Sequence, residues 1–206
     1  MTLCYPTGHT HKDEFEIGYN NYAKQTFATA NTMSYIAPAL TPTSGSPAFR
    51  VYNLDPVTFG VLDFTEYSTS LEASTYQTTG PVWSAYYSAK AAYGPLVTPP
   101  VTAASAELSP AFWHNVTAAF QSNDAAFQQY VSRKSRGWQV SACTGDCKTD
   151  EICQLRAAEA QYNCATVSPG IDFKRDDEES VMKVRESECH GSKVAEMLRN
   201  IAKPAA

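Results

Sequence analysis

Residues 6–15 read PTGHTHKDEF, and the chain continues with EIGY. Two of the four histidines, His9 and His11, stand one residue apart behind a glycine. On a loop, two such imidazoles can converge on neighbouring metal ions, and neutral imidazole is a common zinc ligand. Apolar and polar residues then alternate in EFEIGY, which predicts a strand at 14–19. The stretch indicates either half of a metal site or two exposed histidines, followed by a strand.

The composition is that of a folded, mildly acidic chain. Its 206 residues are 43% hydrophobic and 18% charged, with a formal net charge of −5. This length suits one domain, or a domain with an appendage, around a real core. The acidity argues against nucleic acid or anionic lipid as the main partner. No stretch approaches the roughly 20 apolar residues of a membrane span, and MTLCYPT at the start lacks the features of a secretory signal.

The cysteines nevertheless favour an oxidising compartment. Four of the six lie at 143–164, in CTGDCKTDEICQLRAAEAQYNC, separated by three, five and ten residues. No histidine lies nearby and the spacing is unlike that of structural zinc sites, so we favour two disulfides over zinc. A glycosylation signal at Asn115 agrees, although one such signal can arise by chance. A chain with the cysteine pattern of a secreted protein but without a signal peptide predicts that residues are missing upstream.

The remaining patterns predict strands first and helices second. Besides 14–19, strands are predicted within 26–42 and, joined through a turn at 53–56, within 48–67. Helices are predicted at 81–93, after the cap Ser109-Pro110, after Ser122-Asn123, and from Thr149 onward. The tail is charge-dense, and its last apolar residues recur at helical spacing, which predicts a short docking helix.

Four segments in this order, GHTHKDEFEI, YIAPALTP, FRVYNLD and VLDFTEY, resemble the C-terminal part of the acid sphingomyelinase family. These proteins are metal-dependent phosphodiesterases of the calcineurin-like superfamily. The resemblance continues through FWHN into the cysteine cluster and covers roughly residues 8–166. It implies an α+β fold, in which a partial metallophosphoesterase sheet of antiparallel or mixed strands precedes a disulfide-stapled helical C-terminal region. The implied divisions are a non-family leader at 1–7, strands at 8–80, helices at 81–166, and a charged tail with a short amphipathic helix at 167–206.

The resemblance also implies site residues. His9 would bind one zinc ion of a pair and His11 the other, and the disulfides would be Cys143–Cys147 and Cys153–Cys164. Cys4 and Cys189 are left without an assigned role. The implied activity is the zinc-dependent hydrolysis of sphingomyelin to ceramide and phosphocholine. The implied partners are a sphingolipid or other phosphodiester substrate and a membrane surface. The implied location is extracellular, lysosomal or vacuolar.

Most of the family's site is absent from the sequence. The chain has no Asp-x-His, Gly-Asp-x-x-Asp or Asn-His-Glu/Asp motif, so no catalytic residue is assigned. Catalytic zinc normally has three protein ligands, whereas this chain supplies one histidine per ion, with Asp13 and Glu14 as possible oxygen donors. We therefore expect a truncated member that is inactive alone. His114 and His190 are expected to be surface residues.

Three alternatives remain open. The helical region could be a non-catalytic membrane-surface or protein-binding module that uses Phe112, Trp113, Phe120 and Phe127, although these residues are better interpreted as core. The loop ALTPTSGSP lacks the aromatic residue of some sphingomyelin-cleaving relatives, which leaves nucleotide-type phosphodiesters as substrates. The third alternative is that the chain folds poorly, as a partial sheet with uncovered edges. No nucleic-acid binding is expected.

Overall fold

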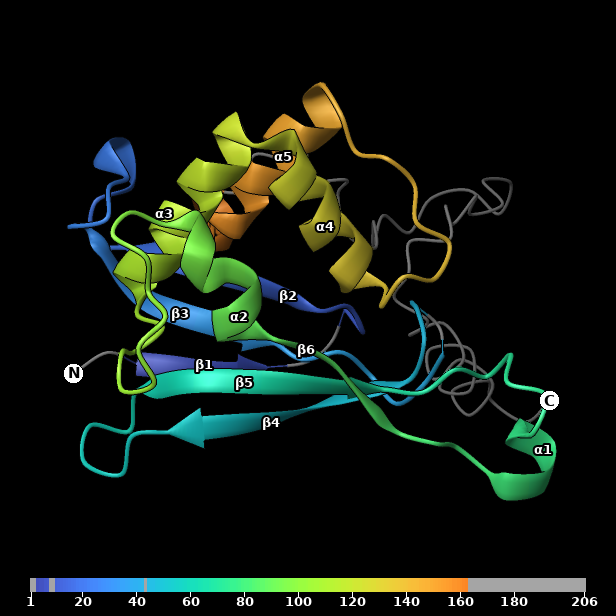
Figure 1. Ribbon diagram of the computed structural model, residues 1–206. Coiled ribbons are helices and arrows are strands. Elements are labelled where there is room, and N and C mark those ends of the chain that lie inside the picture. The colour runs from blue at the N-terminus through green and yellow to red at the C-terminus, as the bar shows by residue number, and fades with distance from the viewer. Residues whose placement is uncertain (1–2, 8–9, 43, 163–206) are drawn as a thin grey trace, which may run out of the picture. The chain divides into compact units, whose positions relative to one another are not determined.

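The structure is a computed structural model that describes residues 3–7, 10–42 and 44–162, with only the backbone for residues 3–7 and Ala160 (Figure 1). The chain divides after Val167 into two units, and all described residues lie in the first. The predicted charged tail lies outside the described residues. The described part is an α+β arrangement of two small sheets and five α-helices, which confirms the predicted fold class.

The first sheet is mixed and contains the strand that follows the histidines. Its order is β1 (Leu3–Thr7), β3 (Ala30–Ile36), β2 (Glu14–Tyr19), with β1 parallel and β2 antiparallel to β3. The predicted strand at 14–19 is confirmed, because its alternating apolar residues are buried. β3 is shorter than the predicted stretch. The first seven residues, expected as a non-family leader, therefore include a strand of this sheet.

The second sheet is antiparallel, in the order β4 (Ala48–Leu54), β5 (Val61–Ser68), β6 (Ser84–Ser88). The predicted pair of strands is confirmed. Their connection turns on Asp55, whose carboxylate accepts hydrogen bonds from the backbone N–H groups of Val57 and Thr58 at 2.8 and 2.9 Å. This is the local side-chain bonding that makes aspartate a turn residue. A four-residue helix, α1 (Tyr76–Thr79), lies between β5 and β6.

The predicted helix at 81–93 is wrong in its first half. Residues 84–88 form β6, which pairs with β5, and only Ala89–Tyr93 form a helix, α2. Pairing of β6, which carries Tyr86 and Tyr87, with β5 overrides the helical spacing, since aromatic residues suit a pleated sheet. The switch occurs at Ser88, whose hydroxyl caps α2 by accepting from Ala91 N, and which donates to Asp63 at 2.6 Å.

The three longer helices are α3 (Pro110–Ser122), α4 (Asp124–Lys134) and α5 (Asp146–Leu155). Both predicted caps are confirmed, because Ser109 Oγ accepts from Phe112 N and Asn123 Oδ1 accepts from Ala126 N. The third helix begins three residues before the predicted Thr149. Gly145, at φ 58°, takes a left-handed conformation that is accessible to glycine and lets the chain enter the helix early.

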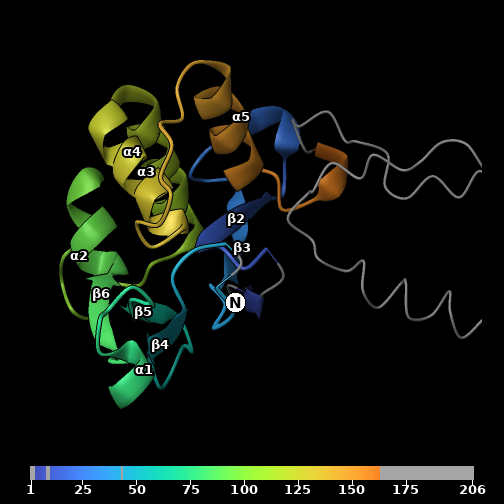
Figure 2. The same ribbon diagram turned by 90° about the vertical axis from the view of Figure 1, so that its right-hand side faces the viewer.

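The helices pack on the sheets: α3 lies against β2 and β3, α5 against β2, and α2 against β5 and β6 (Figure 2). The core between these layers is aromatic. The hydroxyl of Tyr35 accepts from Trp113 Nε1 at 2.7 Å and donates to the carbonyl of Leu108 at 2.9 Å. The four aromatic residues proposed as module contacts are all buried in this core: Phe112, Trp113, Phe120 and Phe127. That finding supports their interpretation as core residues.

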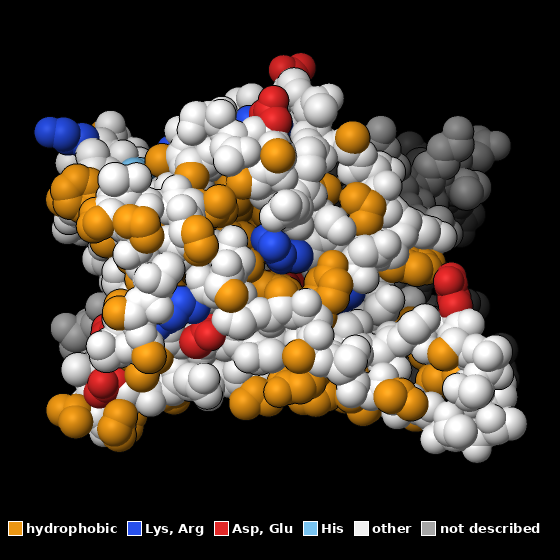
Figure 3. Space-filling model, viewed as in Figure 1, with side chains coloured by type: hydrophobic (Ala, Val, Ile, Leu, Met, Phe, Trp, Pro, Cys, Tyr) orange, Lys and Arg blue, Asp and Glu red, His pale blue; other side chains and the backbone are white. Residues whose placement is uncertain are grey.

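The outer face of the second sheet is apolar and exposed. Hydrophobic side chains gather along the lower edge of the molecule in Figure 3, over β4. Phe49 is 36% exposed; its ring stacks on Tyr67 at 5.3 Å and meets Trp83 edge-on at 5.1 Å. Among the described residues, none of the helices combines the length and the apolar composition needed to cross a membrane.

Candidate functional site

The histidine segment connects β1 to β2. His11 is half-buried and has φ 63°, a left-handed conformation that is uncommon for a residue with a side chain. The chain therefore bends sharply at this residue before it enters the sheet. His9 lies outside the described residues. The structure thus places one of the two predicted zinc ligands, and the convergence of the pair stays a prediction.

Asp13, a predicted oxygen donor to the metal, is instead bound to other protein groups. It is only 5% exposed, and its carboxylate contacts the guanidinium of Arg50 and accepts a 2.5 Å hydrogen bond from the hydroxyl of Tyr87. Its backbone N–H donates to the carbonyl of Lys134 at 3.1 Å. Because both carboxylate oxygens already have protein donors, Asp13 is a structural anchor of the histidine segment.

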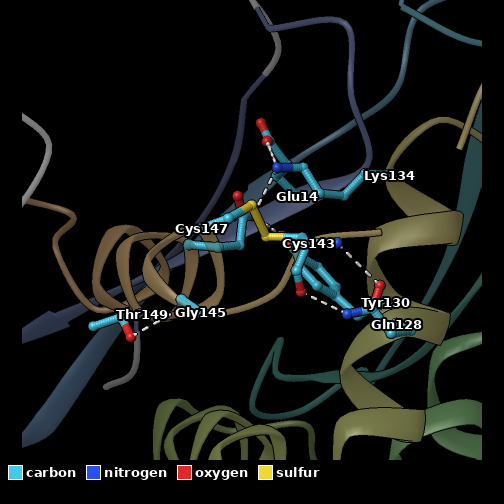
Figure 4. The surroundings of a disulfide bond; sticks show 9 residues. Glu14, Gln128, Tyr130, Lys134, Cys143, Gly145, Cys147 and Thr149 are labelled. Carbon is cyan, nitrogen blue, oxygen red and sulfur yellow. Dashed lines mark hydrogen bonds and ion pairs between the residues drawn. A yellow bond between two sulfur atoms is a disulfide. The ribbon is translucent and has the colours of Figure 1, made fainter. Parts of the chain in front are cut away.

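The carboxylate of Glu14 is likewise bound to other protein groups (Figure 4). Its carboxylate lies 2.9 Å from the ammonium of Lys134 and accepts from Thr10 Oγ1 at 2.7 Å. Lys134 also lies 2.6 Å from Glu151 of α5, so one cation bridges two carboxylates. Burial alone would raise the pKa of Glu14, but Lys134 and Thr10 outweigh it and the pKa is lowered. The cluster fastens β2 to α4 and α5.

Arg136 joins the histidine segment to two other parts of the chain. From just beyond the end of α4, its Nη1 donates to the carbonyls of His11 at 3.2 Å and of Lys134 at 2.6 Å. Its Nε donates to the carbonyl of Ser46, in the loop between β3 and β4, at 2.8 Å. A hollow of about 350 Å³ opens beside it, with Gly45 and Trp138 in its lining. The sequence does not single out Arg136, because its partners are backbone carbonyls, which every residue carries.

A buried carboxylate lies beside the two arginines. Glu66 is fully buried; burial raises its pKa to about 7, against the opposing effect of Arg50 and Arg136. Its Oε2 is 3.6 Å from Arg50 Nε. Within the described part of the chain, neither Glu66 oxygen has a hydrogen-bond partner, and neither does Arg136 Nη2. Glu66 therefore offsets the charge of the arginines without fixing their geometry.

A zinc site at His11 would need further His, Cys, Asp or Glu side chains around it. Over the stretches that the structure describes, no three His, Cys, Asp or Glu side chains lie together as a metal-binding group. The two carboxylates nearest His11 are held by cations and hydroxyls. The described residues thus do not make a zinc centre by themselves.

The disulfide Cys143–Cys147 closes the turn that leads into α5, with 5.3 Å between the Cα atoms (Figure 4). Gln128 of α4 holds this turn through both ends of its amide: Nε2 donates to the carbonyl of Cys143 at 2.6 Å, and Oε1 accepts from its N–H at 3.2 Å. Cys164 lies outside the described residues, so its pairing with Cys153 stays a prediction. Cys189 lies outside them as well, and the side chain of Cys4 is not described.

His114, expected as a surface residue, is half-buried on α3. Its Nδ1 lies 2.8 Å from the hydroxyl of Tyr19 in β2. Burial and the positive charge of Arg156 lower the pKa of His114 to about 4. The next residue, Asn115, is also half-buried, and its glycosylation stays a prediction. His190 lies outside the described residues.

The chain is similar to known phosphodiesterases. No family model matches the chain. It is 28% identical over 159 residues to the human (Homo sapiens) sphingomyelin phosphodiesterase and 26% identical over 170 residues to the bovine (Bos taurus) one, over 74% and 80% of this chain. It is 25% identical over 162 residues, 74% of the chain, to the human acid sphingomyelinase-like phosphodiesterase 3b. All three relatives are phosphodiesterases by name.

The same three relatives support a relationship to one family. The chain is related to the acid sphingomyelinase family. The matched stretch spans 23%, 24% and 32% of the lengths of these relatives, in the order given. The resemblance stated from the sequence is confirmed at this level.

Proposed function

We propose that this chain forms the C-terminal part of a phosphodiesterase site of the acid sphingomyelinase type, and that it does not catalyse hydrolysis alone. The observation that carries the proposal is the similarity to sphingomyelin phosphodiesterases over about three quarters of the chain. The described fold is consistent with it, because the histidine segment is anchored at the edge of a sheet by Asp13 and Glu14.

Two zinc ions are proposed as the cofactors of the complete site, with His9 on one and His11 on the other. When bound, such a pair polarises a phosphodiester and activates water. The role proposed for this chain is limited to presenting the imidazoles, with Asp13 and Glu14, which follow His11, fixed to the rest of the protein. The remaining ligands must come from other polypeptide, since one imidazole per ion falls short of the usual three protein ligands.

The proposed substrate is sphingomyelin, cleaved to ceramide and phosphocholine. A nucleotide-type phosphodiester is the second candidate, because the loop Ala39–Pro47 carries no aromatic residue. An extracellular or lysosomal location is proposed on the Cys143–Cys147 disulfide, which needs an oxidising compartment to persist.

A domain replacement tests the proposal. Residues 8–166 would replace the matching segment of the human sphingomyelin phosphodiesterase, and the chimera would be assayed with zinc on sphingomyelin vesicles and on a chromogenic phosphodiester. We expect measurable hydrolysis of at least one substrate, lost in His11→Ala. A folded, zinc-loaded chimera without activity on either would refute the family role. Hydrolysis by the isolated chain would refute its incompleteness.

A further inference from the structure

Arg136 is a buried cation with an unusual set of partners. It is 5% exposed, yet its hydrogen bonds go to backbone carbonyls and not to a carboxylate. The three carbonyls belong to His11, Ser46 and Lys134, which come from three separate segments. Burying a guanidinium is unfavourable unless its donors are bonded and its charge is compensated, and in Arg136 the bonding falls to three carbonyls.

The bonds of Arg136 link the short segment from His11 to Asp13 to the end of α4. The carbonyl of Lys134 accepts from Arg136 Nη1 and also from the N–H of Asp13, which its two lone pairs permit. Arg136 Nη1 in turn reaches the carbonyl of His11. The chain that leaves the bend at His11, at φ 63°, is therefore held at the His11 carbonyl and at the Asp13 N–H by Arg136 and Lys134.

The loop between β3 and β4 is pressed against the same guanidinium. Gly45 has φ 139°, and a Cβ at this position would lie 2.7 Å from Arg136 Nη2 and 2.3 Å from the carbonyl oxygen of Ser135. Only glycine permits this approach. The neighbouring Ser46 carbonyl accepts from Arg136 Nε. The loop and the histidine bend thus share one support.

We infer that Arg136 is a positioning residue, which fixes the histidine bend and the loop at residues 44–47 at a constant spacing. This inference rests on the proposed function, in which the bend presents the metal-binding imidazoles. Arg136 itself touches neither metal nor substrate. Burial lowers the pKa of Arg136, and the buried carboxyl of Glu66 opposes that shift.

The test is hydrogen exchange of single backbone amides in the folded chain, measured by NMR. In Arg136→Gln, we expect the Asp13 amide, bonded to Lys134, and the Lys12 amide to exchange roughly tenfold faster than in the wild type. Arg156→Gln is the control, because Arg156 is a half-buried arginine whose guanidinium binds Thr117 on α3. It should leave both amides unchanged.

Two further variants separate positioning from general stability. Arg136→Lys should restore part of the protection, because Lys90 of this chain shows that an ammonium can bind three carbonyls, those of Ala103, Ala104 and Ala106. Gly45→Ala should speed exchange at Lys12 and Asp13 by pushing the loop off Arg136. Gly80→Ala, with a positive φ but open space around it, should not.

Unchanged exchange at Lys12 and Asp13 in both Arg136→Gln and Gly45→Ala would overturn the inference, as would equal acceleration in Arg156→Gln. In the active chimera, Arg136→Gln should lower kcat more than it raises KM. The exchange measurement needs neither metal nor activity. A failed chimera with the expected exchange pattern would therefore refute the proposed function and leave the support by Arg136 intact.

Discussion

The hydroxyl of Tyr87 in β6 donates a 2.5 Å hydrogen bond to the carboxylate of Asp13, which stands two residues after His11. Arg50 of β4 contacts the same carboxylate from the other side. The second sheet therefore holds the chain that leaves the histidine bend. A buried ion pair, Asp13 with Arg50, therefore lies two residues along the chain from His11, and Tyr87 is hydrogen-bonded to it.

The first prediction compares the contributions of the Tyr87 hydrogen bond and of the Asp13–Arg50 ion pair to the free energy of unfolding. Tyr87→Phe removes one hydrogen bond and should lower the free energy of unfolding by about 1 kcal/mol. Asp13→Ala removes the carboxylate bound to Arg50, which is 1% exposed, and leaves only Glu66, 3.6 Å from Arg50 Nε, so it should cost about 3 kcal/mol. Urea denaturation measures both. If Asp13→Ala is as mild as Tyr87→Phe, the buried pair is not the anchor described.

The second prediction concerns the bridge made by Lys134. Lys134→Met should lower the free energy of unfolding at neutral pH by about 2–3 kcal/mol, because Glu14 and Glu151 would face each other without a cation. Lys24→Met, on an exposed lysine, should stay within about 0.5 kcal/mol of the wild type.

This cost should depend on pH. The pKa of Glu14 is lowered from 4.5 in the folded chain, so its contribution is complete above that value and is lost as the pH falls through the folded pKa. The difference between wild type and Lys134→Met should shrink in acid. A difference that stays constant from pH 7 to strongly acidic solution would contradict the bridge.

The third prediction concerns His114. Its pKa is about 4 in the folded chain against 6.5 for the free side chain. Between these values the unfolded chain binds a proton that the folded chain does not, so the free energy of unfolding should fall as the pH drops from 6.5 to 4. Because the ring is half-exposed, the loss should be about 1–2 kcal/mol. In His114→Gln the slope of stability against pH should flatten, and an equally steep slope would exclude His114 as its source.

The fourth prediction separates a core from a binding surface. Trp113→Ala should cost about 3–5 kcal/mol, because it opens a cavity and leaves the Tyr35 hydroxyl without its donor. Near-UV circular dichroism and vesicle co-sedimentation would be measured together. A variant that keeps its fold but loses vesicle binding would support the membrane-module alternative.

The parts of the fold that could be predicted are those in which local signals agree. At 110–134, the caps Ser109 and Asn123 and the apolar face all mark the same helices. At 81–93 they conflict: the spacing is helical, but pairing of Tyr87 with Glu66 in β5 decides for a strand. That partner is distant in sequence and leaves no trace in the local pattern.

The candidate site was predictable only in part, for the same reason. His9 and His11 stand out by type and spacing. The partners that fix the bend do not, because Arg136 is 125 residues from His11 and binds its carbonyl, a group that every residue carries. The sequence predicts Asp13 and Glu14 as possible oxygen donors, since it does not reveal their cationic partners in β4 and α4.

The central claim is that this polypeptide cannot assemble a paired zinc centre from its own side chains. A crystal structure of the purified chain, grown with zinc and checked by anomalous scattering at the zinc edge, tests it most directly. We predict no pair of zinc ions bridged by side chains of one molecule. Two fully occupied zinc ions at His9 and His11, bridged by a carboxylate of the same chain, would contradict the account.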